Sequence, residues 1–177
     1  MSQTLGPILI TRQEIQQRVE QLGQMVSRDY EGKIITIVAI LKGSFIFLAD
    51  LVRQIDPDIP VEMDFMSVTS YGNSLYSSGE VRIENDIRIP IEDKDVLIVE
   101  DIVDSGLTLA YVHKVLMMRH PRSLRAAALL QKPGVSQYNS PLDYVGFQVP
   151  DQYVVGYGLD AAQRFRNLPD IRVMEIS

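Results

Sequence analysis

The chain has no cysteine and only two histidines among its 177 residues. Without cysteine, the protein can form no disulfide bond, no thiolate nucleophile and no cysteine–zinc site. The two histidines, His113 and His120, do not have the HExxH spacing that binds zinc on one face of a helix. A histidine-rich metal site is therefore not expected.

Excess basic charge and long apolar runs are also absent. The net charge of −6 and the pI near 4.9 disfavour nucleic acid and anionic membranes as partners, because both attract basic surfaces. No apolar run approaches the roughly 18–20 residues that span a bilayer. The first residues lack the basic-then-apolar pattern of a signal peptide. We therefore expect a cytoplasmic protein that forms one domain over residues 1–177.

The chain alternates apolar strands with amphipathic helices. Thr11 and Glu14 make a capping box ahead of the first predicted helix, and Ser44 is expected to cap the second. Residues 160–167 fit either a short helix or a loop. The predicted helices cover about residues 12–27, 45–54 and 106–119, and the predicted strands cover 33–40, 61–69, 80–84, 87–91, 96–100, 124–130, 143–148, 153–157 and 172–176. This order predicts an α/β fold with a mainly parallel, doubly wound sheet, which binds ligands at the carboxyl ends of its strands.

One stretch, residues 96–109 (VLIVEDIVDSGLTL), combines a buried strand, three carboxylates and a tight loop. The loop leads into a helix N-terminus, where backbone N–H groups and the helix dipole favour a phosphate. Glu100 and Asp101 would repel that phosphate unless they bind ribose hydroxyls or Mg²⁺. The stretch therefore predicts a sugar-phosphate site. The alternative is a strand that ends in solvated acids, with Ser105 as an ordinary helix N-cap.

The same stretch resembles the phosphoribosyl-pyrophosphate signature of the type I phosphoribosyltransferases. The shared pattern is an apolar strand, Glu-Asp, two apolar residues and Asp-Ser-Gly-x-Thr. Further segments resemble the hypoxanthine–guanine branch of this family in the expected order, namely residues 41–44, 70–71, 131–133 and 154–160 followed by 165–168. The resemblance covers nearly the whole chain. It implies that family's fold, with a small hood built from about residues 1–15 and 150–177.

The resemblance also implies roles for individual residues. Asp104 would be the catalytic base, and Glu100, Asp101 and Asp160 would bind Mg²⁺, a cation that prefers oxygen ligands. The residues expected to contact the substrates are Leu41, Lys42, Gly43, Ser70, Tyr71, Glu100, Asp101, Ile102, Val103, Asp104, Ser105, Gly106, Leu107, Thr108, Lys132, Tyr153, Val154, Asp160 and Arg166. The family is further expected to have a cis peptide at Leu41–Lys42 and a lid over residues 70–79 that excludes water.

Several of these residues also fit ordinary structural roles. Lys132 would be a solvated lysine in a turn, and Arg166 would form a surface ion pair with Asp160 or Asp170. Asp104 would be a helix N-terminal acid or a turn-former. An aromatic such as Tyr153 in a short strand is more often part of a core.

The implied activity belongs to purine salvage. A phosphoribosyl group would pass from phosphoribosyl pyrophosphate to hypoxanthine or guanine, which gives IMP or GMP and pyrophosphate. The Lys132 ammonium suits the O6 carbonyl of a 6-oxopurine and would meet the amino group of adenine donor against donor. The preference among hypoxanthine, guanine and xanthine stays open. The resemblance implies a homodimer or homotetramer. The alternative function is a non-catalytic regulator that senses nucleotides or phosphoribosyl pyrophosphate, which the acidic charge disfavours.

Overall fold

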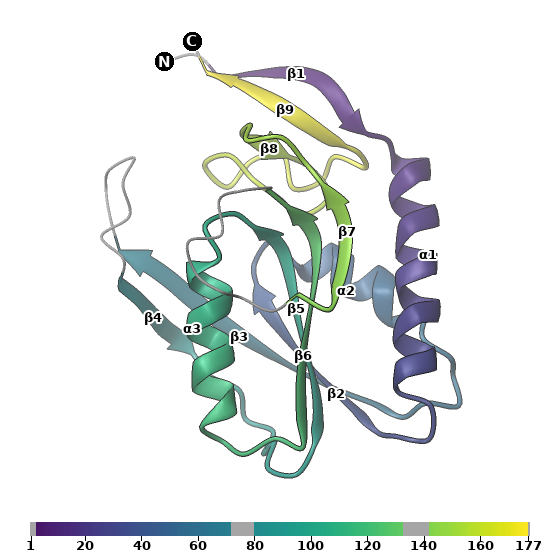
Figure 1. Ribbon diagram of the computed structural model, residues 1–177. Helices are drawn as coiled ribbons and strands as arrows, with labels where there is room; N and C mark the ends of the chain where they lie inside the picture. Colours follow the sequence, from purple (N-terminus) through teal and green to yellow (C-terminus); the bar gives the residue numbers. More distant parts are fainter. Residues whose placement is uncertain (1–2, 72–79, 133–141, 177) are drawn as a thin grey trace.

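Figure 1 shows the computed structural model of the chain, in which a six-stranded sheet carries helices on its faces and a small second sheet at one end. The structure describes residues 3–71, 80–132 and 142–176. The main sheet contains β2 (Ile35–Leu41), β3 (Val61–Tyr71), β4 (Glu80–Asn85), β5 (Asp95–Val103), β6 (Ser123–Gln131) and β7 (Tyr144–Gln148). The helices are α1 (Arg12–Asp29), α2 (Phe45–Val52) and α3 (Leu107–Met117), and the small sheet contains β1 (Gln3–Ile10), β8 (Val154–Val155) and β9 (Ile171–Ile176).

The main sheet is parallel apart from one edge strand. Its order is β4-β3-β2-β5-β6-β7, and only the β3–β4 pair is antiparallel. The chain moves outward from β2 to β3 and then returns to pair β5 against the other side of β2. Such a reversal of strand order opens a crevice at the carboxyl ends of the two central strands. The predicted α/β, mainly parallel, doubly wound sheet is therefore confirmed.

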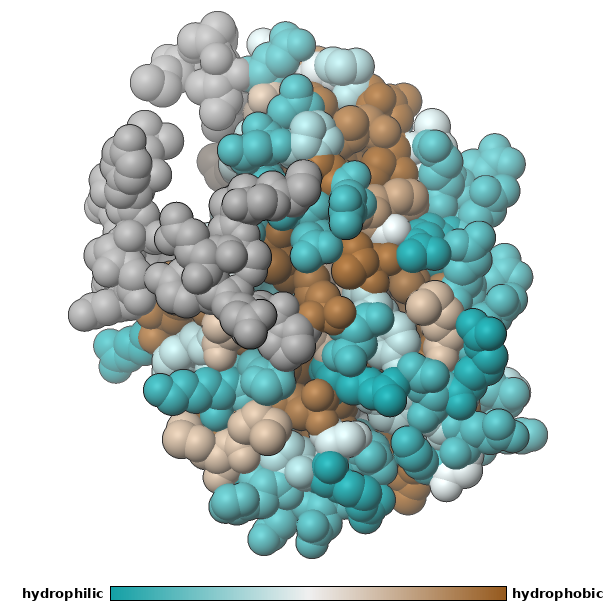
Figure 2. Space-filling view, viewed as in Figure 1, coloured by the Kyte–Doolittle hydropathy of each residue, from teal (hydrophilic) through white to brown (hydrophobic). Residues whose placement is uncertain are grey.

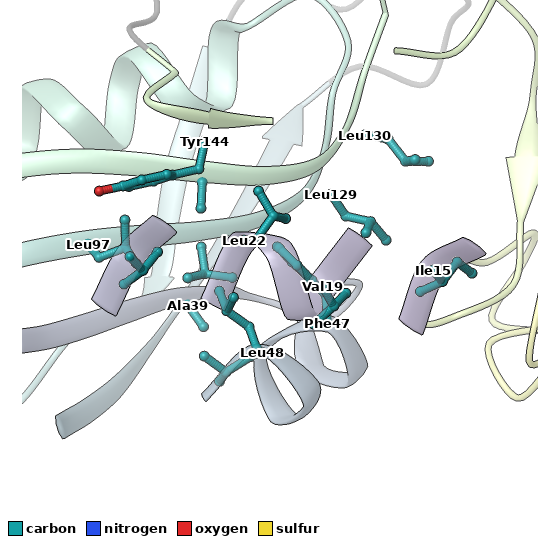
Figure 3. Packing of buried hydrophobic residues seen from close by; sticks show 14 of the residues in the cluster. Ile15, Val19, Leu22, Ala39, Phe47, Leu48, Leu97, Leu129, Leu130 and Tyr144 are labelled. Atoms are coloured by element: carbon teal, nitrogen blue, oxygen red, sulfur yellow. The ribbon is translucent and has the colours of Figure 1, made fainter. Parts of the chain in front are cut away.

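Both faces of the central strands are buried. Successive side chains of a strand point to opposite faces, so Leu97 and Val99 pack toward α1 and α2, whereas Val96 and Ile98 pack toward α3. Figure 3 shows the first of these contacts, with apolar side chains of α1 and α2 facing Ala39, Leu97 and Leu129 of the sheet. This two-sided burial explains why the strand sequences are continuously apolar.

The helix starts agree with the sequence in one case and differ in another. The capping box of α1 is present, because the Glu14 amide donates to Thr11 Oγ1 at 3.3 Å and the Thr11 amide donates to Glu14 Oε2 at 2.8 Å. Ser44 occupies the predicted N-cap position of α2, but its side chain makes no capping hydrogen bond. Its hydroxyl donates to the carbonyl of Ile40 at 2.5 Å instead, which ties the loop back to β2.

Two strand predictions need correction. Residues 87–91 form no strand, because the amides of Arg88 and Ile89 donate to the Asp64 carboxylate at 2.5 and 2.9 Å rather than to a neighbouring strand. The strand predicted over residues 153–157 shrinks to Val154–Val155, because Gly156 and Tyr157 have φ values of 101° and 50° that end the extended backbone.

The small sheet forms the predicted hood and joins the two ends of the chain. Its order is β1-β9-β8, and both pairs are antiparallel (Figure 1). The sequence did not predict β1, and residues 12–15 belong to α1 rather than to the hood. Residues 160–167 form a loop with an isolated bridge between Ala161 and Arg164. None of the described helices has the length and apolar character that crossing a membrane requires.

Candidate active site

The residues selected from the sequence gather where the parallel strands end. Leu41 ends β2, Glu100 and Asp101 lie near the end of β5, and Lys132 directly follows β6. Strands β5, β6 and β7 run toward the hood, which lies beyond their carboxyl ends (Figure 1). Figure 2, in the same view as Figure 1, shows exposed hydrophobic residues between hydrophilic ones. The sheet topology therefore brings together segments that are distant in sequence.

The loop after β5 surrounds a hollow suited to a small anion. The hollow measures about 80 Å³ and is lined by Glu100 and residues 102–109. Gly106 is the N-cap of α3 and adopts φ 82°, a left-handed conformation that a side chain would strain. The Leu107 amide donates to Ser105 Oγ at 3.3 Å, so Ser105 supports the turn without being the N-cap. The backbone at the start of α3 thus faces the hollow, as an anion site requires.

Glu100 is a buried carboxylate with an unsatisfied oxygen. Only 6% of the residue is exposed, and its Oε2 has no hydrogen-bond partner among the described residues. Burial raises the pKa of Glu100 well above its ordinary value, and the nearby charge of Asp101 raises it further. A buried polar atom without a partner is costly. The site therefore favours a cation or a hydroxyl group that would satisfy this oxygen.

Asp101 faces the loop after β2. A Cβ atom built on Gly43 would lie 1.5 Å from Asp101 Oδ2, so only glycine leaves room for this carboxylate. Gly158, from the hood, also packs closely against this loop, since its Cβ would lie 2.2 Å from the carbonyl oxygen of Gly43. Desolvation raises the pKa of Asp101 to about 6. Because Glu100 and Asp101 are adjacent in β5, their side chains point to opposite faces of the sheet. A ligand that contacts both must therefore lie across the end of the strand.

The hood contributes an arginine and an aspartate. Arg166 donates to the carbonyl of Gly158 at 2.7 Å and pairs with Asp160 Oδ1 at 2.8 Å. An ion pair between Arg166 and Asp160 was the alternative role expected for Arg166. The pair does form, but it lies at the site itself. Both groups act electrostatically on Asp101, with Arg166 lowering the pKa of that carboxyl and Asp160 raising it. The exposed Tyr153 donates its hydroxyl to the carbonyl of Asp160 at 3.0 Å, so this ring does not belong to a core.

Lys132 is held between two carboxylates. Its Nζ lies 3.1 Å from Asp104 Oδ2 and 3.0 Å from Asp151 Oδ1, and its side chain is only 10% exposed. The alternative of a solvated lysine in a turn is therefore wrong. Burial by itself lowers the pKa of the ammonium, but the bonds to Asp151 and Asp104 leave that pKa above its ordinary value. A permanently charged donor thus lies beside the candidate base.

Other predicted contact residues can offer only backbone groups or lie partly outside the described residues. The side chains of Ile102, Val103 and Val154 pack into the hydrophobic clusters. The expected cis peptide at Leu41–Lys42 is present. The predicted lid falls on residues 70–79, of which 72–79 and the side chains of 70 and 71 lie outside the described part of the chain.

The oxygen donors fit a magnesium ion that is completed by its substrate. No group of three histidines or carboxylates suited to a metal occurs among the described residues. Mg²⁺, however, binds through one or two carboxylates and takes its other oxygens from water and phosphate. The unpartnered Glu100 oxygen and the adjacent Asp101 meet that requirement. Asp160 lies on the hood side, where its carboxylate is already paired with Arg166.

Two residues of the site were not predicted from the sequence. Asp151 follows β7 in a polar turn and carried no motif that would single it out. Gly158 was part of the hood segment, but its close approach to Gly43 depends on how the hood docks. Asp151 could not be recognised without knowing that the ends of β5, β6 and β7 are neighbours.

Comparison with known proteins agrees with this geometry. The family model described as "Phosphoribosyl transferase domain" matches residues 9–162. The hypoxanthine-guanine phosphoribosyltransferase of Bacillus subtilis (strain 168) is 45% identical over 175 residues, which cover 99% of this chain and 96% of the relative. The hypoxanthine phosphoribosyltransferase of Salmonella typhimurium is 44% identical over 164 residues, with 92% of this chain and 91% of the relative covered.

A solved structure of a relative has the same fold over nearly the whole chain. The crystal structure of a hypoxanthine-guanine phosphoribosyltransferase from Bacillus anthracis superimposes with a TM-score of 0.91 at 39% identity, over 99% of this chain and all of that one. Fold and site together define a phosphoribosyltransferase. The chain belongs to this family and, within it, to the hypoxanthine(-guanine) phosphoribosyltransferases, the transferases of purine salvage.

Proposed function

We propose that this chain transfers the phosphoribosyl group of phosphoribosyl pyrophosphate to N9 of hypoxanthine, and also of guanine, forming IMP or GMP and pyrophosphate. The observation that carries the proposal is the ion pair between Asp104 and Lys132, at 3.1 Å. A candidate base and a donor for a purine carbonyl lie side by side, next to a loop shaped for a phosphate. The full-length similarity to two purine-salvage enzymes supports the same activity.

The donor substrate would lie along the ends of β5 and β2. The backbone and hydroxyls of residues 105–108 would hold the 5′-phosphate at the N-terminus of α3. The ribose hydroxyls would bind to Glu100 and Asp101. The pyrophosphate would lie against the backbone of residues 41–43, with Lys42 and Arg166 nearby. Arg166 offers the forked guanidinium that suits phosphate oxygens.

The purine would enter between the β6 end and the hood. Lys132 would donate to O6, Tyr153 would stack on the ring, and the backbone carbonyls of Val154 and Asp160 would accept from the purine edge. As N9 bonds to the anomeric carbon, the bond from that carbon to pyrophosphate breaks. Asp104 accepts the proton that leaves N7, which is the work of a general base.

Magnesium completes the charge balance of the site. Glu100 and Asp101 would hold the ion, and Asp160 would take part in a second position on the hood side. When bound, Mg²⁺ supplies positive charge that neutralises pyrophosphate oxygens. This explains how an acidic chain binds an anionic substrate, since Lys42 and Arg166 alone add only two positive charges.

We also propose that the enzyme assembles as a homodimer or homotetramer. Phe45, Met63 and Phe65 expose 45%, 45% and 41% of their surface, and the last two share one face of β3. Large exposed apolar side chains that lie together favour a protein contact. Light scattering coupled to size-exclusion chromatography would measure the mass. The cytoplasmic location stays a prediction.

The activity can be tested with three purines in parallel. Purified protein with Mg²⁺ and phosphoribosyl pyrophosphate should convert hypoxanthine to IMP, followed by absorbance or chromatography, and guanine and xanthine should be assayed beside it. Absence of turnover with all three bases would refute the proposed transferase activity. Binding of IMP without turnover would instead support the non-catalytic regulator.

A further inference from the structure

Three neighbouring strands of the sheet each end in one charged residue of a single cluster. Asp104 follows β5, Lys132 follows β6 and Asp151 follows β7 after a short turn. The backbone fixes these strand ends to one another, since the Lys132 amide donates to the Val103 carbonyl at 3.0 Å and the Val149 amide donates to the Gln131 carbonyl at 2.9 Å. The cluster is therefore built by the sheet itself rather than by flexible loops.

Within the cluster, both carboxylates accept hydrogen bonds from the same ammonium group, that of Lys132. An ammonium has three N–H donors. Asp104 Oδ2 receives one at 3.1 Å and Asp151 Oδ1 receives another at 3.0 Å. The third N–H is left to point elsewhere. With two bonds holding Nζ in place, the direction of that third donor is restricted.

We propose that Asp151 is a positioning residue for the acceptor purine, which holds the Lys132 ammonium away from a closed pair with Asp104 and aims its third N–H at the O6 carbonyl. This inference rests on the proposed function and adds a residue to it. The charges support the assignment. Two carboxylates share one ammonium, so the Lys132 charge is not taken up by Asp104 alone.

Without Asp151 the cluster becomes a neutral pair. Lys132 would then turn fully toward Asp104, since nothing else among the described side chains is bonded to its Nζ. That movement would take the donor away from the purine and would place a closed ion pair at the candidate base. The donor substrate should be affected less, because Asp151 is not among the residues that line the hollow after β5.

Asp151→Asn tests the proposal because it keeps the shape and removes the charge. Asp151 is 76% exposed, so solvent weakens its ion pair and the effect should be moderate. We expect a higher KM for hypoxanthine and a lower kcat that together reduce kcat/KM about three- to fivefold, while the KM for phosphoribosyl pyrophosphate stays within about twofold. Asp151→Glu should restore part of the loss, since it returns the carboxylate.

Asp86→Asn is the matched control. Asp86 is also an exposed acid in an ion pair, with Arg119 at 2.7 Å, but it lies by the C-terminal end of α3, opposite the phosphate loop. This variant should match the wild type in all three constants. An Asp151→Asn enzyme with unchanged constants, or with equal rises in both KM values and a lowered melting temperature, would overturn the positioning role while wild-type turnover stands. A wild type inactive on every oxopurine would overturn the proposed function and this inference with it.

Discussion

Replacing Gly43 by alanine should separate the activity of the enzyme from its stability. The added methyl would lie 1.5 Å from Asp101 Oδ2, whereas ordinary contact begins at 3.4 Å. The atom in the way is the end of a side chain rather than backbone, so the Asp101 carboxylate can rotate aside. It must retreat by about 2 Å to regain ordinary contact.

The expected costs of that displacement differ for stability and for activity. An off-rotamer side chain costs about 0.5–1.5 kcal/mol, which lowers the melting temperature of a chain of this size by only a few degrees, at about 2–4 °C per kcal/mol. A group misplaced by about 1 Å or more in a reacting complex can cost on the order of 10² in rate. Gly43→Ala should therefore reduce kcat/KM for phosphoribosyl pyrophosphate on the order of a hundredfold while the protein stays folded.

Gly32→Ala provides the opposite control. Gly32 has φ 71° and no atom within 4 Å of an added Cβ, so alanine there strains the backbone without touching a neighbour. It should lose about 1–2 kcal/mol of unfolding free energy and keep wild-type kinetics. Steady-state assays and thermal melts of both variants decide the matter. Wild-type activity in Gly43→Ala would show that the position of the Asp101 carboxylate does not matter for binding the donor.

Three further predictions concern single groups. Asp104→Asn should lower kcat by about 10²–10⁴, the usual contribution of a general base, and leave the Kd for phosphoribosyl pyrophosphate nearly unchanged; equal losses in both would argue against the base. Chelation with EDTA should abolish turnover and added MgCl₂ should restore it, and full activity in EDTA would contradict the metal site. The Arg172 guanidinium lowers the pKa of Asp170 below its ordinary value, so this pair stabilises the fold above the unfolded pKa of about 3.9 and the contribution disappears as the pH falls through the lower folded value. The difference in melting temperature between wild type and Asp170→Asn should accordingly be present at pH 6 and vanish toward pH 2, and a difference independent of pH would refute it.

The sequence predicted the parts of the site that lie within one continuous segment. The stretch from Val96 to Thr108 contains a strand, its terminal acids and the phosphate loop, and all of these are local features of hydrophobic spacing and turn residues. The parallel sheet followed from the alternation of strands with helices. The strand, the turn and the helix start were confirmed because neighbouring residues determine them, whereas the binding roles of these residues stay predictions.

The failure at Ser44 is local, whereas the other failures have a common physical origin in contacts between distant segments. Ser44 looked like an N-cap, but its hydroxyl found the Ile40 carbonyl instead. Residues 87–91 have strand-like spacing, yet Asp64 takes two of their amides. β1 was missed because its strand exists only by pairing with β9, at the other end of the chain. Asp151 is likewise a polar turn residue until the sheet brings it to Lys132.

The pairing of β1 with β9 has a consequence for the order in which the enzyme is made. β1 is synthesised before every strand of the main sheet, whereas its partner β9 is synthesised after all of them. Every neighbour of the main sheet is available before then. β1 therefore has no partner strand while the main sheet is being synthesised, and an unpaired strand edge is prone to pair with other chains. The segment proposed to bind the phosphate, at the end of β5, is likewise synthesised before the hood segment proposed to bind the purine.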